Sequence, residues 1–202
     1  MISIKVIFDM SKQPNLYIIA GPNGSGKTSF ADTFLPTYTD CKNVVKADNI
    51  AKWLSPYSPR AAGRKTGRLA LKETRSYAGK GSDFAFETTL SGKKYVSFIN
   101  DLKQKGYKTH LFFLWIPSVD LSIARIKDRV ARGGHDVPEA DVRRRFDRGI
   151  YNFFKLYESL LDLWILFDNS TARPNLIAKK EDGTLDVQDN ELYNKIKKSI
   201  GT

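Results

Sequence analysis

Short apolar runs alternate with longer amphipathic stretches along this chain. Five runs have the length and composition of buried strands, namely Leu16–Ala20, Val44–Ala47, Phe84–Glu87, Thr109–Ile116 and Trp164–Phe167. Helical patterns separate them at Thr28–Phe34, Pro59–Tyr77, Lys93–Lys105, Val119–Ala131 and Pro138 to about Leu161. Strands that alternate with helices favour a parallel sheet. We therefore expect an α/β protein with a five-stranded parallel sheet and helices on both faces.

The two ends of the chain add less. Asp182-Gly183 predicts a hairpin, and a closing helix is expected from about Asn190. Ile2–Phe8 fits either a strand or a leader. We find no repeat, low-complexity tract or long linker, so residues 1–202 are predicted to form a single domain.

Composition predicts a globular protein of the cytoplasm. The 41% apolar content is ordinary, and no apolar run approaches the roughly 20 residues that cross a bilayer. Lys5 and Asp9 interrupt the apolar residues at the N-terminus, which argues against a signal peptide. The single cysteine, Cys41, cannot form an internal disulfide, and this suits a reducing compartment.

The charge is strongly basic, with 33 Lys and Arg against 22 Asp and Glu, a formal net charge of +11. Such a charge fits a nucleic-acid binder or an enzyme that handles polyphosphates with arginines. One basic group comprises Arg125, Arg129, Arg132, Arg143, Arg144, Arg145 and Arg148, and a second comprises Arg60, Arg64, Lys65 and Arg68. The first group follows a helix-loop-helix pattern, which favours a phosphate clamp, although a solvated helix face explains about half of these residues.

The most specific motif is GPNGSGKT at residues 21–28, directly after the first strand and at the start of a helix. It matches the P-loop, in which glycines let backbone N–H groups curl around a phosphate. Lys27 is expected to reach the β- and γ-phosphates, and the Thr28 hydroxyl to bind Mg²⁺. ATP and Mg²⁺ are the predicted cofactors. The predicted nucleotide-binding residues of this segment are Gly21, Pro22, Asn23, Gly24, Ser25, Gly26, Lys27, Thr28 and Ser29.

Four segments together resemble the zeta-toxin family of P-loop kinases, in its short stand-alone branch. They are GPNGSGKTSFA, KADNIAKWLSP, FETTLSG and RIKDRVARGGHDVPEADVRRRF, and the resemblance runs from about Asn15 to Asn169. It implies a three-layer P-loop NTPase fold, ATP with Mg²⁺, and phosphoryl transfer to an alcohol group of a small molecule. Better-known toxin members phosphorylate UDP-N-acetylglucosamine, so a nucleotide-sugar is one candidate acceptor. The resemblance also raises an antitoxin protein as a partner; no fused antitoxin domain is visible in this chain.

Two carboxylates follow strands, where ligands of parallel sheets bind. Asp48 ends the second strand and can accept the proton of an attacking hydroxyl, and the resemblance matches it to the proposed general base. Its alternative role is to cap the next helix. Glu87 could hold Mg²⁺ through water or bind a substrate hydroxyl, and the resemblance favours substrate contact. Thr88 is a further candidate for the substrate site. The pair Asp168-Asn169 fits either a position near the adenine or an ordinary turn.

A glycine-hinged segment between two arginine-bearing helices, at about residues 132–145, is predicted to be a lid over ATP. Arginines aimed at the γ-phosphoryl group speed its transfer. Three successive arginines on a helix point in different directions, so only some of them can face the site. We predict catalytic roles for Arg132 and Arg144 and nucleotide contact for Arg129.

These features favour an ATP-dependent kinase of a small molecule, with Lys27, Asp48, Arg132 and Arg144 as catalytic residues. The alternative is a nucleic-acid-directed P-loop kinase or ATP-binding module, which the net charge motivates. Against it, the chain has no RNA-binding aromatic motif, helix-turn-helix signature or zinc finger, so nucleic acid is the less favoured partner. An ATPase switch would need an acidic pair after an apolar strand, and LFFLWIPSVD offers only the distant Asp120.

Overall fold

The computed structural model describes residues 13–46 and 63–201, with the side chains of 63–67 left aside. The strands are β1 (Asn15–Ala20), β2 (Val44–Val45), β3 (Phe84–Thr88), β4 (Lys108–Trp115), β5 (Leu163–Asp168), β6 (Asn175–Glu181) and β7 (Thr184–Val187). The α-helices are α1 (Lys27–Thr33), α2 (Leu35–Tyr38), α4 (Gly63–Gly79), α5 (Tyr95–Gln104), α6 (Val119–Ala131), α7 (Glu139–Asn152) and α8 (Asn190–Ser199). Asp48, the predicted base, lies outside the described residues.

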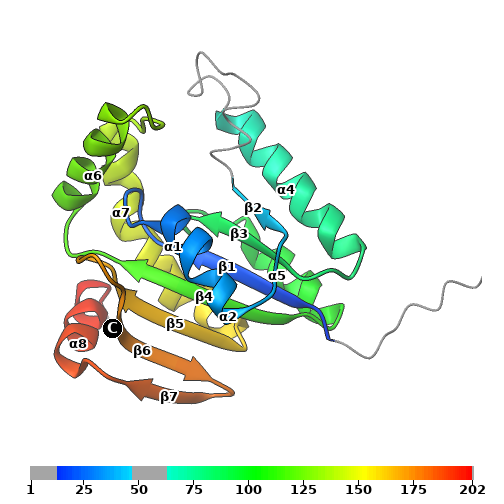
Figure 1. The fold of residues 1–202 in the computed structure, drawn as a ribbon. Coiled ribbons are helices and arrows are strands. Elements are labelled where there is room, and N and C mark those ends of the chain that lie inside the picture. The colour runs from blue at the N-terminus through cyan, green and yellow to red at the C-terminus, as the bar shows by residue number, and fades with distance from the viewer. Residues whose placement is uncertain (1–12, 47–62, 202) are drawn as a thin grey trace, which may run out of the picture.

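One sheet organises the molecule, in the order β2-β3-β1-β4-β5-β6-β7 (Figure 1). The first five strands of this order run parallel, which confirms the predicted α/β class. Within the described residues the sheet has seven strands, because two antiparallel strands join the five predicted parallel ones. The predicted hairpin at Asp182-Gly183 exists, but β6 also pairs antiparallel with β5 and so extends the sheet. Both turn residues have positive φ, 47° and 83°, as a two-residue hairpin requires.

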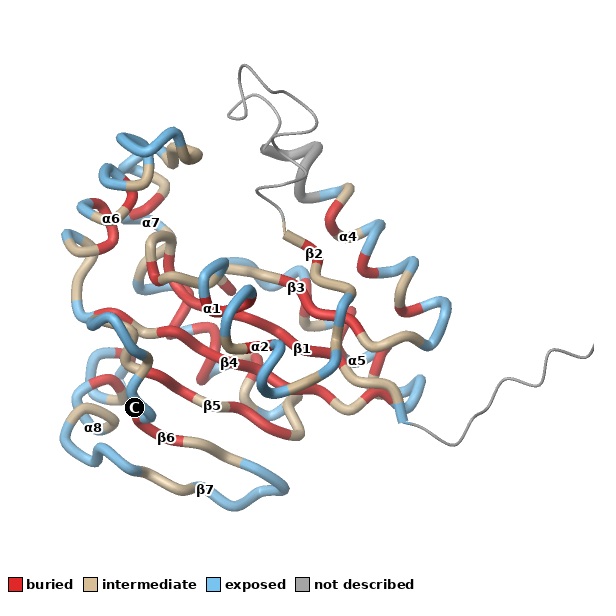
Figure 2. The backbone as a smooth tube through the Cα atoms, in the orientation of Figure 1, coloured by how far each residue is buried: buried red, intermediate tan, exposed pale blue. Residues whose placement is uncertain are grey.

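Helices cover both faces of the sheet, and the alternation of side chains along β1 shows how. Leu16 and Ile18 belong to a core beneath α4, α5 and α8, whereas Tyr17 and Ile19 pack on the other face with α1 and α2. Figure 2 shows the central strands buried along most of their length, with exposed residues on the outer sides of the helices. This is the predicted three-layer arrangement.

The helix predicted from Pro138 to Leu161 is not a single α-helix. Pro138 is the N-cap, α7 ends at Asn152, and the chain continues as a π-helix over Phe153–Tyr157 and a 3-10 helix over Glu158–Leu160. The wide turn of the π-helix buries both Phe153 and its neighbour Phe154. The Phe153 ring stacks on the Phe113 ring, with 5.2 Å between the ring centroids, and contacts the Trp164 ring edge-on, with 5.3 Å between the centroids. Packing against β4 and β5 therefore overrides the α-helical period here.

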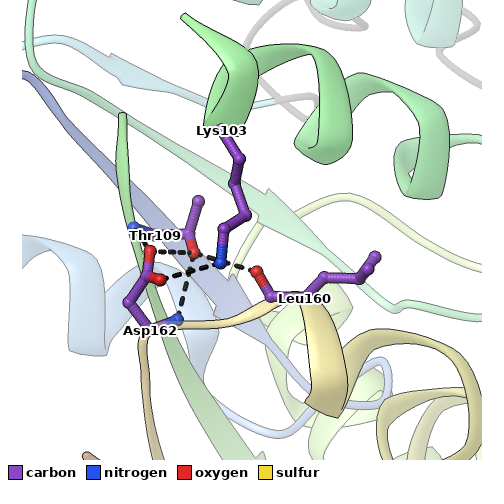
Figure 3. A network of polar contacts seen from close by, with 4 residues as sticks. All are labelled: Lys103, Thr109, Leu160 and Asp162. Carbon is purple, nitrogen blue, oxygen red and sulfur yellow. Dashed lines mark hydrogen bonds and ion pairs between the residues drawn. The ribbon is translucent and has the colours of Figure 1, made fainter. Parts of the chain in front are cut away.

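A polar network joins the N-terminal ends of β4 and β5 (Figure 3). Because these strands run parallel to β1, this end of the sheet lies opposite the P-loop. The Asp162 carboxylate accepts hydrogen bonds from Lys103 Nζ at 2.7 Å and from the backbone N–H and Oγ1 of Thr109, both at 2.8 Å. Partial burial by itself would raise the pKa of Asp162, but the bonds from Lys103 and Thr109 together hold that pKa below its usual range. The network ties α5 to both strands.

Within residues 13–46 and 63–201, each helix is too short or too polar to cross a bilayer.

Candidate active site

The P-loop forms the turn from β1 into α1, in the middle of the parallel strands. Two of its glycines are required by their surroundings. Gly24 has φ 74°, and a Cβ there would lie 2.6 Å from the carbonyl oxygen of Ser122. Gly26, the N-cap of α1, has φ 86°, and a Cβ there would lie 2.7 Å from Asn169 Nδ2. Backbone conformation and close packing thus both exclude a side chain, and the loop keeps its N–H groups uncovered by Cβ atoms.

The side chains at the end of the loop gather a cation, a hydroxyl and a carboxylate. Lys27 Nζ donates to the carbonyl oxygens of Gly21 at 3.0 Å and Pro22 at 2.7 Å, so the ammonium lies across the loop. Thr28 Oγ1 donates to Glu87 Oε2 at 3.0 Å. Glu87 reaches this position because β3 pairs with β1 and sets Glu87 beside Ile19. The structure therefore brings three of the predicted site residues together.

Thr88, the neighbouring candidate, has a local role. Its Oγ1 accepts a hydrogen bond at 3.1 Å from the backbone N–H of Leu90, which has the unusual φ of 51°. A threonine hydroxyl that binds the backbone two residues on stabilises a turn. The structure thus gives Thr88 the ordinary strand-end role, and substrate contact by this residue stays a prediction.

The predicted lid connects α6 to α7, and both helices stand at the end of the sheet where β1, β4 and β5 finish (Figure 1). Arg129 contacts the segment between the two helices, because its guanidinium donates to the carbonyl oxygen of His135 at 2.5 Å. Gly134 passes so close to Arg129 that a Cβ there would clash with Cγ of Arg129 and lie 2.8 Å from its carbonyl oxygen. These contacts make Arg129 a support of the segment that joins α6 to α7. Nucleotide contact by Arg129 stays a prediction.

The other lid arginines occupy the surface. Arg132 is exposed at the C-cap of α6. Arg144 pairs with Asp141 at 2.7 Å on its own helix, and this hydrogen bond is the main reason that the pKa of Asp141 lies below its usual range. Arg143 pairs with Glu139 in the same way, also at 2.7 Å. These pairs hold the guanidinium groups on α7, and the catalytic roles of Arg132 and Arg144 remain predictions.

Three residues outside the predicted set contact the loop or its supports. Ser122 Oγ donates to the carbonyl oxygen of Asn23, and Asn169 Nδ2 donates to that of Ser25 at 2.6 Å. Arg125 donates to the backbone carbonyl oxygens at Asn169 and Ser170, each at 2.8 Å. The sequence signal for Arg125 was its membership of the arginine group. Asn169 had two open interpretations, and Ser122 had no signal.

The oxygen atoms near Thr28 fit a magnesium ion. Mg²⁺ prefers hard oxygen donors and usually keeps several waters, so a hydroxyl and one carboxylate beside the phosphates form a suitable donor set. The hydrogen bond from Thr28 to Glu87 places these donors side by side. Among the described residues no group of three or more His, Cys, Asp and Glu could hold a metal ion. Thr28 and Glu87 are therefore suitable Mg²⁺ ligands by their chemistry, and metal binding here stays a prediction.

Comparison with known proteins gives a family match. The family model described as Zeta toxin matches residues 3–161. A protein of Haemophilus influenzae, described as uncharacterized, is 32% identical over 126 residues, which cover 62% of this chain and 88% of that protein.

Solved structures agree with the fold. A chain in the AvrRxo1-ORF1:-ORF2 complex with ATP has a TM-score of 0.72 at 21% identity; the match covers 92% of this chain and 64% of that chain. A chain of the PezAT chromosomal toxin-antitoxin system of Streptococcus pneumoniae has a TM-score of 0.60 at 16% identity, covering 94% and 87%. A chain of the Pnkp1/Rnl/Hen1 RNA repair complex has a TM-score of 0.57 at 16% identity, and the match covers 73% of this chain and 47% of that chain. At these identities the likeness shows the fold alone, and this chain spans less than two thirds of the AvrRxo1 chain.

Proposed function

Because the chain belongs to the zeta toxin family, we propose that it is an ATP-dependent kinase that phosphorylates a hydroxyl group of a small molecule. The observation that carries the proposal is the cluster at the P-loop. A lysine, a threonine hydroxyl and a carboxylate from the neighbouring strand lie together at the end of a loop whose glycines pack too closely to carry side chains. Phosphoryl transfer depends mainly on positioning and charge stabilisation, which are the functions that such a cluster serves.

Lys27, Thr28 and Glu87 would each have a separate role in the reaction. The Lys27 ammonium, held by carbonyl oxygens of the loop, can exchange them for phosphate oxygens and neutralise negative charge there. Thr28 and Glu87 would hold Mg²⁺, Thr28 directly and Glu87 by orienting the hydroxyl or a bound water. When bound, Mg²⁺ supplies charge neutralisation at the β- and γ-phosphate oxygens.

The acceptor hydroxyl needs a base. Asp48, which the family resemblance matches to the base, is the proposed proton acceptor. Its carboxylate would take the hydroxyl proton while the hydroxyl oxygen forms a bond to the γ-phosphorus. The bond from that phosphorus to the bridging oxygen breaks, and ADP leaves. The products are ADP and a phosphate ester of the acceptor.

Arg132 and Arg144 are the proposed lid arginines. Arg132 is exposed and precedes Gly133, which has a φ of 80° just after the end of α6. The Arg144 side chain is 53% exposed and its partner Asp141 lies on the same helix. Closing of the lid would bring these guanidinium groups to the transferred phosphoryl group and exclude water.

The acceptor class rests on the family. A nucleotide-sugar such as UDP-N-acetylglucosamine is the proposed acceptor, because well-known toxin members use it. An antitoxin is the proposed protein partner, and the likeness to the PezAT toxin-antitoxin system supports it. The net charge of +11 keeps a nucleic-acid 5′-hydroxyl as the second candidate acceptor.

The test is an acceptor screen. The protein is incubated with ATP, Mg²⁺ and single acceptors, namely UDP-sugars, nucleosides, free sugars and a 5′-hydroxyl RNA, and products are identified by mass spectrometry. We expect a singly phosphorylated UDP-sugar. Lys27→Ala should lower the rate by about 10²-fold or more, and Asp48→Asn should lose turnover while ATP still binds. The matched control is Lys198→Ala, an exposed lysine on α8, which should keep the wild-type rate.

Two results would count against this assignment. Phosphorylation of the RNA end alone would replace the small-molecule acceptor by the nucleic-acid one. Equal rates for Lys27→Ala and the wild type would remove the P-loop from the reaction, and with it the proposed kinase.

A further inference from the structure

Two carbonyl oxygens of the P-loop are bound from outside the loop by side chains distant in sequence. Ser122, fully buried on α6, donates its hydroxyl to the carbonyl oxygen of Asn23. Asn169, just after β5, donates its amide N–H to the carbonyl oxygen of Ser25 at 2.6 Å. These partners are 99 and 144 residues away from the loop along the chain.

Each of these bonds also fixes an N–H group. In a trans peptide unit the C=O and the following N–H point in opposite directions, and all peptide bonds of the described residues are trans. A bond that holds the Asn23 carbonyl toward Ser122 therefore turns the N–H of Gly24 to the opposite side of the loop. In the same way, the bond from Asn169 to the Ser25 carbonyl turns the N–H of Gly26 away from Asn169.

The packing allows little alternative to this arrangement. A Cβ at Gly24 would lie 2.6 Å from the Ser122 carbonyl oxygen, and one at Gly26 would lie 2.7 Å from Asn169 Nδ2. The two supports thus press directly against the loop at the residues whose N–H groups they orient. Close contact on the outer side leaves these peptide units little freedom to rotate.

Arg125 holds the second support in place. Its two terminal nitrogens donate to the carbonyl oxygens of Asn169 and Ser170, each at 2.8 Å, while the backbone N–H of Asn169 donates to Trp115 at 2.8 Å. Arg125 lies three residues after Ser122, so both side chains extend from one face of α6. One helix face therefore supports both bound carbonyls, directly through Ser122 and indirectly through Arg125.

We propose that Ser122 and Asn169, the latter held by Arg125, are positioning residues that aim the N–H groups of Gly24 and Gly26 at the phosphates of the nucleotide. This inference rests on the proposed function, since it requires a nucleotide in the P-loop. Dipoles fixed before binding stabilise charge without reorganisation, so the supports contribute to phosphate affinity although they touch no phosphate. They are not expected to affect contacts to the nucleoside.

The experiment compares phosphate-bearing and phosphate-free ligands. Affinities for ATP, pyrophosphate and adenosine are measured by titration calorimetry for the wild type, Ser122→Ala and Asn169→Ala. Each variant should bind ATP and pyrophosphate about 3- to 10-fold more weakly, as expected for one lost hydrogen bond. Its affinity for adenosine should stay within about twofold of the wild type. Asn194→Ala, an exposed asparagine on α8, is the matched control and should change none of the three.

The outcomes separate this inference from the proposed function. A wild type that binds neither ATP nor pyrophosphate overturns both. A wild type that binds both ligands, with Ser122→Ala and Asn169→Ala binding equally well, overturns only the positioning role. An equal loss of affinity for adenosine and pyrophosphate also overturns the positioning role, since general destabilisation of the protein would weaken the binding of all ligands. Should Asn169→Ala not fold, Ser122→Ala and Arg125→Lys decide, because a lysine keeps the charge but cannot bridge both carbonyl oxygens.

Discussion

Asp162 offers the sharpest test of the architecture, because a single carboxylate joins three elements. It accepts from Lys103 on α5 and from both the backbone N–H and the hydroxyl of Thr109 on β4, and it directly precedes β5 (Figure 3). Asp162→Asn keeps the shape of the side chain and one acceptor oxygen. It removes the charge and replaces the second acceptor by an NH₂ group, which cannot accept from Thr109 or Lys103.

The expected loss follows from these contacts. We expect the amide oxygen to face Thr109, so that both Thr109 bonds remain but become neutral and the Lys103 bond is lost. A hydrogen bond to a charged group contributes about 1.5–3 kcal/mol and a neutral one about 0.5–1.5, so each Thr109 bond weakens by about 1 kcal/mol. The Lys103 side chain is 35% exposed, so water screens the ion pair and its share is small. We expect Asp162→Asn to lower the free energy of unfolding by about 2 kcal/mol, or the Tm by about 4–8 °C for a chain of this length.

Urea unfolding at several pH values is the assay. The folded-state pKa of Asp162 lies below its unfolded value, so its stabilisation is present above an unfolded pKa of about 4 and is lost as pH falls through the folded pKa. The gap between the wild type and Asp162→Asn should therefore narrow below about pH 4. The control is Asp182→Asn, at an exposed aspartate in the hairpin turn beside Asp162, and its free energy of unfolding should change little at any pH. A gap of the same size at pH 7 and pH 3 would refute the reasoning.

Two further predictions concern the P-loop. Gly24→Ala places a Cβ 2.6 Å from the Ser122 carbonyl oxygen at a φ of 74°, and should weaken ATP binding in titration calorimetry by at least about 10-fold and lower stability by about 1–2 kcal/mol; unchanged ATP affinity would show that the loop can bind phosphate in another conformation. Glu87→Gln should reduce the Mg²⁺-dependent gain in ATP affinity several-fold while leaving Mg²⁺-free ATP affinity equal or higher, since the carboxylate beside Thr28 loses its charge; a retained Mg²⁺ gain would remove Glu87 from the metal site.

The parallel strands could be predicted from the sequence because each of them has a local pattern. Each buried strand is a continuous apolar run, and the P-loop motif states its own strand-loop-helix context. The additions at the sheet edge were harder to foresee. The turn Asp182-Gly183 identifies a hairpin, but nothing local indicates that β6 would join β5 antiparallel. The π-helix at Phe153–Tyr157 also depends on the partners Phe113 and Trp164, which the helical period does not reveal.

The site shows the same division between local and distant information. The motif identified Lys27 and Thr28, and strand pairing brought Glu87 to them as the strand-end rule led us to expect. Ser122 and Asn169 reach the loop across 99 and 144 residues, so only the folded chain reveals them. The sequence gave no signal for Ser122, and it raised Asn169 only as a residue near the adenine or in an ordinary turn, not as a support of the loop.

Much of the positive charge in the predicted lid region is already paired within the fold, although the net charge of the chain is +11. Arg125 and Arg129 bind backbone carbonyl oxygens and so act as supports. Arg144 and Arg145 share Asp141, with nitrogen–oxygen distances of 2.7 and 2.9 Å. Exposed pairs of this kind are worth at most about 1 kcal/mol, so an incoming phosphate, which carries more charge than one carboxylate, can replace them at little cost. We therefore expect the acidic first turn of α7 to hold these guanidinium groups until a phosphate displaces the carboxylate.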